Sequence, residues 1–152
     1  MGEFVVEKSV DVEAPVREVW KEMIAVQEWP SWKPFMQKAS IGGGYETLTN
    51  GSVIWMLLKM AGPVGTPLRV RVNRFEMPRR LGWEGGINNL VRAEHTFTFE
   101  EKGGKTRITS REDFQGYLLW FFFLFVTRED LENLHQNWLA AIKARVEGNG
   151  SG

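Results

Sequence analysis

Three side chains that can transfer protons or form hydrogen bonds are predicted to share the inner face of two neighbouring strands. In residues 92–101, alternation places His95 on the side that carries phenylalanine. In residues 105–114, Ser110 and Glu112 fall on the more apolar side. An imidazole ionises near neutrality and a carboxylate accepts protons. His95 and Glu112 are therefore candidates for general acid–base catalysis, and all three groups for orienting the polar end of a ligand.

A structural interpretation of the same residues remains open. His95 would then hydrogen-bond Ser110 or Glu112 within a buried network, or Glu112 would form a salt bridge at the end of its strand. In either case a polar group on an apolar face needs a partner, because burying it without one costs free energy.

Aromatic residues are unusually abundant, with seven Trp and ten Phe among 152 residues. Large rings either fill a core or form the wall of a pocket for an apolar ligand, and composition does not separate the two. Together with His95, Ser110 and Glu112, the candidate ligand-binding residues are Trp55, Trp83, Phe97, Phe99, Phe114, Trp120 and Trp138.

Composition and motifs exclude several other kinds of site. Nineteen basic and nineteen acidic residues balance, so no cationic field favours nucleic acid as a partner. With no cysteine, only two histidines and no HExxH spacing, we expect no metal site. No phosphate-binding loop or Gly-x-Ser-x-Gly motif occurs, and we expect no cofactor.

The elements that must position these residues are a run of short strands and the two segments that flank it in sequence. A strand-to-helix opening covers residues 5–35, and an amphipathic helix at 127–146 closes the chain. Glycine and proline clusters divide the region between them into hairpin-sized segments. This order predicts an α+β fold with a curved antiparallel sheet wrapped around one long helix, and such a sheet encloses space.

Two segments at the end of the chain carry specific predictions. Thr127 and Asp130 resemble a capping box at the start of the last helix. The apolar run just before it, residues 117–126, is too short to span a bilayer as a helix, so we expect it to be buried against the sheet. For residues 120–125 within this run, the alternatives are a pocket gate or an interface with a membrane or a second subunit.

Several pieces of the chain, in order, resemble the START-related helix-grip (SRPBCC) superfamily, in particular its polyketide cyclase/dehydrase and lipid-transport branch. They are VDVEAPVREVW from residue 10, WPSWKPF from residue 29, PRRLGW from residue 78, HTFTFE from residue 95, GKTRIT from residue 104 and EDFQG from residue 112. The resemblance implies a seven-stranded antiparallel sheet that grips the C-terminal helix, two short helices after the first strand, and an internal cavity for hydrophobic molecules.

The leading hypothesis is therefore a cytoplasmic, single-domain protein (residues 1–147, with a flexible tail at 148–152) that binds a lipid, a steroid-like compound or an aromatic polyketide. The alternative is a cofactor-independent cyclase or dehydratase in which His95 and Glu112 transfer protons. A monomer or a homodimer is expected, and membrane contact is a third, less favoured possibility.

Overall fold

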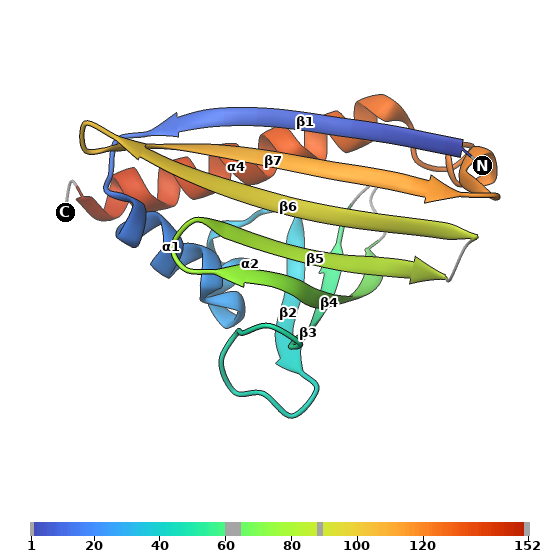
Figure 1. Cartoon of the computed structure of the whole chain (residues 1–152), viewed down its shortest axis with the longest axis horizontal. Coiled ribbons are helices and arrows are strands. Elements are labelled where there is room, and N and C mark those ends of the chain that lie inside the picture. Colours follow the sequence, from blue (N-terminus) through green and yellow to red (C-terminus); the bar gives the residue numbers. More distant parts are fainter. Residues whose placement is uncertain (1, 60–64, 88–89, 151–152) are drawn as a thin grey trace.

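A single curved sheet wraps around one long helix in the computed structural model, which describes residues 2–59, 65–87 and 90–150 (Figure 1). The seven strands are antiparallel and lie in the order β1-β7-β6-β5-β4-β3-β2. Their bounds are β1 Gly2–Val12, β2 Met36–Gly42, β3 Val53–Leu58, β4 Thr66–Glu76, β5 Arg80–Ile87, β6 Val91–Lys102 and β7 Lys105–Gly116. The helices are α1 Val16–Ile24, the 3-10 helix η1 Val26–Glu28, α2 Trp29–Trp32, α3 Leu119–Phe122 and α4 Arg128–Gly150. The predicted helix-grip fold is confirmed.

The register of β6 and β7 brings the candidate polar residues together. His95 lies directly opposite Glu112, and Phe97 lies directly opposite Ser110. Directly opposite residues of an antiparallel pair project from the same face of the sheet. The alternation expected from the sequence therefore places all three polar side chains on the concave side, facing α4.

Helix α4 begins with the predicted capping box. The Thr127 N–H donates to Asp130 Oδ2 (2.9 Å), and the Asp130 N–H donates to Thr127 Oγ1 (3.1 Å). The helix runs to Gly150 rather than to residue 146, so residues 148–150 of the expected flexible tail are helical. The last turns gain an i, i+4 ion pair between Lys143 and Glu147 (2.7 Å), which favours this extension. Its buried stripe is the expected one: Leu131, Leu134, Trp138, Leu139, Ile142 and Val146.

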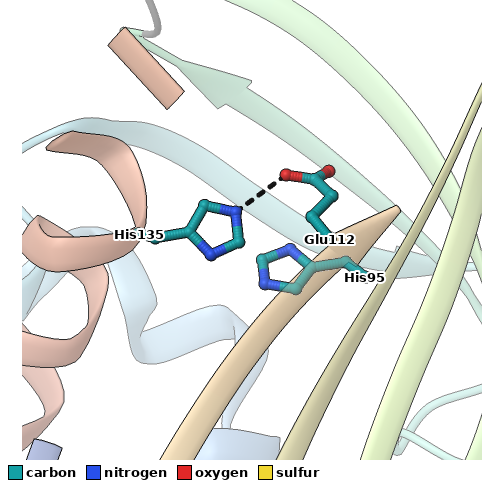
Figure 2. A group of neighbouring side chains, drawn as sticks. All are labelled: His95, Glu112 and His135. Atoms are coloured by element: carbon teal, nitrogen blue, oxygen red, sulfur yellow. Dashed lines mark hydrogen bonds and ion pairs between the residues drawn. The ribbon is translucent and has the colours of Figure 1, made fainter. Parts of the chain in front are cut away.

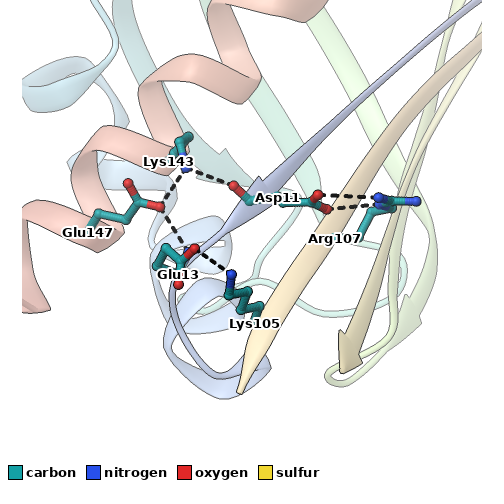
Figure 3. Close-up of polar contacts among 6 residues, drawn as sticks. All are labelled: Asp11, Glu13, Lys105, Arg107, Lys143 and Glu147. Atoms are coloured by element: carbon teal, nitrogen blue, oxygen red, sulfur yellow. Dashed lines mark hydrogen bonds and ion pairs between the residues drawn. The ribbon is translucent and has the colours of Figure 1, made fainter. Parts of the chain in front are cut away.

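Polar contacts tie the end of α4 to the edge of the sheet (Figure 3). Lys143 Nζ donates to the Asp11 carbonyl oxygen (2.8 Å), and Glu147 Oε2 accepts from the Glu13 N–H (2.9 Å). Arg107 on β7 forms a two-pronged pair with the Asp11 carboxylate (2.9 and 3.2 Å). These side chains are mostly exposed, so the contacts fix orientation more than they add stability.

The core consists of two groups of buried side chains. The larger group joins α1, α2 and most of α4 to the sheet, and it contains Trp20, Trp29, Trp83, Phe97 and Trp138. The smaller group lies near α3 and contains Val6, Phe114, Leu119 and Leu131. No helix in the described part of the chain has the length and apolar character needed to cross a membrane.

Candidate functional site

A cavity of about 150 Å³ lies between the concave face of the sheet and α4, and it is partly open to solvent. Its wall includes side chains from both groups of the core, among them Trp83 and Phe114. Gly85, Gly86 and Ala93 are the small residues of its lining. The other lining residues are Met56, Leu58, Leu68, Arg69, Val70, Val91, His95, Glu112, Phe122, Leu134 and Trp138.

His95 and Glu112 are polar groups on the inner wall, and a chain of hydrogen bonds joins them through Ser110 and His135. Figure 2 shows its last contact, between His135 and Glu112. His95 Nε2 lies 2.7 Å from Ser110 Oγ, and Ser110 Oγ lies 2.9 Å from His135 Nδ1. His135 Nε2 in turn lies 2.9 Å from Glu112 Oε1. Both ends of the chain line the cavity, whereas Ser110 and His135 do not, so the chain links two cavity-facing groups through a buried path.

The environment of His95 favours its neutral form. Burial lowers the pKa of the imidazole well below its usual value, and the nearby His135 and Lys33 lower it further. The His95 ring also stacks on the rings of Phe97 and His135, with centroids 4.4 and 4.6 Å apart. A neutral imidazole keeps one nitrogen free to accept a proton, which suits either a hydrogen-bond acceptor or a general base.

Eight further candidate residues from the sequence fall into four groups. Trp83, Phe114 and Trp138 line the cavity with His95 and Glu112. Phe97 and Phe99 are buried but do not line it: Phe97 packs against Trp138 (5.5 Å between centroids) and Phe99 against Trp20. Ser110 acts within the chain of hydrogen bonds rather than at the wall. The remaining two, Trp55 and Trp120, lie elsewhere.

Trp55 and Trp120 face outward, contrary to the expectation that they form pocket walls. On β3 the neighbours Ile54 and Met56 point into the core, so alternation turns Trp55 to the outer face, where it is 50% exposed. In the single turn of α3, Leu119 and Phe122 point inward, and Trp120 is therefore 64% exposed.

The apolar segment around α3 is only partly buried, and the prediction that it packs against the sheet is wrong for most of its side chains. Leu119 is buried and Phe122 reaches the cavity wall. The exposed members are Tyr117, Leu118, Trp120, Phe121, Leu124 and Phe125. One helical turn presents only one side to the protein, so the other rings have nothing to cover them. The alternatives of a gate or an interface remain predictions.

His135 was missed by the sequence analysis, although a signal was available. It is 1% exposed and lies on α4 four residues after Leu131 and three before Trp138, within the apolar stripe. A polar residue at such a position needs a partner on the facing sheet. In the structure these partners are Ser110 and Glu112.

The two histidines and Glu112 also raise the question of a metal site. One ligand atom from each lies within 4.8 Å of the other two, a proximity that a count of histidines alone did not predict. The two imidazole rings are stacked, with their planes at 27° to each other. The nitrogens facing Ser110 and Glu112 are already hydrogen-bonded. A metal ion at this position would have to replace these hydrogen bonds.

Lys33 is a second buried ionisable group that the sequence analysis did not single out. Its side chain is fully buried, and its Nζ has no hydrogen-bond partner among the described residues. The nitrogen lies 3.8, 4.6 and 3.6 Å from the ring centres of Trp29, Trp32 and Trp138. Burial lowers the pKa of the amine well below its usual value.

The curved sheet, the gripped helix and the cavity between them define a helix-grip protein of the START-related superfamily. The chain belongs to the polyketide cyclase/dehydrase and lipid transport family, whose model matches residues 3–147. A search of curated protein sequences finds no relative of this chain.

Several solved structures share the fold at low sequence identity. A START superfamily protein from Mycobacterium smegmatis is 15% identical, with a TM-score of 0.75 over 97% of this chain and 99% of that one. The ZhuI aromatase/cyclase from Streptomyces sp. R1128 is 20% identical, with a TM-score of 0.74 over 96% and 94%. A norcoclaurine synthase from Thalictrum flavum is 14% identical, with a TM-score of 0.73 over 98% and 97%. These similarities establish the fold and not the ligand.

Proposed function

We propose that the protein binds a small hydrophobic molecule in the cavity between the sheet and α4. The observation that carries this proposal is a partly open, mainly apolar cavity with His95 and Glu112 on one wall. Such a site combines an apolar surface that supplies affinity with a few polar groups that fix orientation. Membership of the polyketide cyclase/dehydrase and lipid transport family supports the same class of ligand.

The size of the cavity restricts what it holds. An apolar cavity of about 150 Å³ accommodates a molecule such as benzene. A lipid, a steroid-like compound or a polyketide would therefore place one ring or one short chain inside. The remainder would extend through the open side or would displace Phe122 on α3.

Toluene is a suitable probe of this proposal, and ligand-observed NMR together with thermal unfolding measures its binding. We expect a dissociation constant of about 1 mM or tighter, because burying one ring supplies roughly 4–5 kcal/mol net. A ligand that binds the folded state raises the melting temperature with concentration.

A pair of matched variants localises that binding. Ala93→Leu fills the cavity from β6 and should abolish the binding of toluene. Ala140→Leu makes the same change on the exposed side of α4 and should leave it unchanged. The proposal is wrong if toluene does not bind, or if it binds both variants equally well.

A proton-transferring enzyme is the second candidate, favoured by the chain that couples His95 to Glu112. Two relatives in fold, the aromatase/cyclase and the norcoclaurine synthase, are enzymes by name. A cyclase or dehydratase mechanism would use one of these groups to remove a proton from a carbon acid held in the cavity and the other to return it.

Cyclohexanone tests this second candidate without knowledge of the natural substrate. In D₂O, a base in the cavity should accelerate exchange of its α-protons, followed by NMR. His95→Ala should lose this acceleration while keeping most of the melting temperature, and Glu112→Gln should reduce it. If the wild type shows no exchange activity and His95→Ala loses much of its stability, the hydrogen-bond network of His95 has a structural role.

A further inference from the structure

We infer that the cavity selects ligands that carry a hydroxyl hydrogen to donate, such as a phenol, because both polar groups on its inner wall present hydrogen-bond acceptors. The inference rests on the proposed function, since it names the chemical class of the ligand for the same site. It follows from the direction of the hydrogen bonds between Glu112 and His95, which can be derived one bond at a time.

Glu112 determines the first direction. An ionised carboxylate can only accept, so the proton in the 2.9 Å contact with Glu112 Oε1 belongs to His135 Nε2. A neutral imidazole carries a single N–H. His135 Nδ1 is therefore an acceptor.

The donor and acceptor roles of Ser110 then determine which nitrogen of His95 carries a proton. Its single O–H donates to His135 Nδ1 across 2.9 Å, which leaves Ser110 Oγ to accept across 2.7 Å from His95 Nε2. A neutral His95 then carries its only proton on Nε2. Its second nitrogen, Nδ1, carries no proton and has a lone pair that can accept a hydrogen bond.

That lone pair and the carboxylate are both available to the cavity. Figure 2 shows one ring nitrogen of His95 directed to the side on which the Glu112 carboxylate lies. Within the described residues, no group hydrogen-bonds to His95 Nδ1 or to Glu112 Oε2. The donors of the lining are the guanidinium of Arg69, which is exposed and lies 5.5 Å from the Trp55 ring, and the indole N–H groups of Trp83 and Trp138. The Trp138 N–H is buried and has no hydrogen-bond partner among the described residues.

A ligand with only acceptor groups would leave both wall acceptors buried and unpaired, which is unfavourable. A hydroxyl hydrogen satisfies one of them, and the contact is strengthened if the acceptor is the carboxylate. An apolar ring bearing a hydroxyl therefore matches the volume, the apolar lining and the polarity of the wall together.

The charge state of His135 sets the condition for the measurement. A doubly protonated His135 would donate to Ser110, which would then donate to His95 Nε2 and leave a proton on Nδ1. The experiment is therefore carried out at a mildly alkaline pH of about 8.

The protonation of His95 can be observed in the wild-type protein without any substitution. A two-bond ¹⁵N–¹H correlation spectrum distinguishes a protonated ring nitrogen from a bare one. We expect His95 to carry its proton on Nε2 and none on Nδ1. A proton on Nδ1 at this pH would overturn the inference.

Binding of phenol and toluene provides the second test, because the two molecules have nearly the same shape and differ in the donor. Water holds phenol more strongly, so a purely apolar cavity prefers toluene. We expect phenol to bind the wild type at least as tightly as toluene. In His95→Phe, which keeps a ring and leaves the Ser110–His135–Glu112 bonds in place, the ratio should shift towards toluene by about tenfold.

The possible results separate this inference from the proposed function. If toluene binds but phenol is weaker by the same factor in the wild type and in His95→Phe, the selection of donors is refuted and the cavity remains a binding site. If neither molecule binds, the proposed function itself fails. A preference for phenol that disappears in His95→Phe supports both.

Discussion

Replacing Lys33 with methionine is expected to stabilise the protein by about 1–3 kcal/mol, although the substitution lies in the core. The Lys33 side chain is fully buried, and its Nζ finds no hydrogen-bond partner in the described part of the structure. Methionine has a similar length and flexibility but carries no group that loses hydration on folding. For a chain of this size the melting temperature should rise by about 2–4 °C per kcal/mol.

The dependence of stability on pH tests whether the buried amine of Lys33 causes this difference in stability. Burial lowers the pKa of Lys33 well below 10.5 in the folded state. At a pH between the folded-state and unfolded-state pKa values, the unfolded chain therefore binds the proton and the folded chain does not. The free energy of unfolding of the wild type should therefore rise with pH through this window. It should change less in Lys33→Met, as urea unfolding at a series of pH values up to about 10 would show.

Lys38→Met provides a control on the neighbouring strand β2, where the lysine is exposed. It should change the stability by less than about 0.5 kcal/mol and leave the pH dependence as in the wild type. The three indole rings around Lys33 favour its charged form and oppose the effect of burial. A Lys33→Met protein that is less stable than the wild type at neutral pH would mean that these rings outweigh desolvation.

Trp138→Ala is expected to cause the largest loss of stability, about 3–5 kcal/mol. The ring is 2% exposed. Its centre lies 5.3 Å from that of Trp29, 5.8 Å from Phe35, 5.7 Å from Trp83 and 5.5 Å from Phe97. Removing it takes away one wall of the cavity and leaves a hole that these four rings cannot close, because they are held at separate positions of the backbone.

Trp55→Ala is the matched control for this large-to-small change. The same side chain is half exposed on the outer face of β3, so its loss should cost less than about 1 kcal/mol. Urea unfolding of both variants measures the difference. Equal losses of unfolding free energy would show that both tryptophans contribute alike to stability, and the prediction based on the burial of Trp138 would be wrong.

Much of the fold could be predicted because local patterns in this chain agree with its tertiary structure. Alternation in residues 92–101 and 105–114 assigned His95, Ser110 and Glu112 to the inner face, and the capping box at Thr127 located the start of α4. The resemblance to the helix-grip family supplied the number of strands and the two short helices.

Local patterns were less informative where the sequence is apolar in every position. In residues 53–58 and 117–125 large apolar side chains occur on both sides of the element, so hydrophobicity did not show which of them point inward. The structure turns Trp55 and Trp120 outward, since Met56 and Phe122 occupy the inward positions.

The sequence by itself determined the element order, the facing of the alternating strands and the apolar stripe of α4, because these depend on residues close together in the chain. Only the tertiary structure decided that His135 completes a chain from Glu112 to His95, and that three indoles surround Lys33. These partners come from elements far apart in sequence. Their meeting depends on how α4 sits against the sheet, a relation that no local pattern contains.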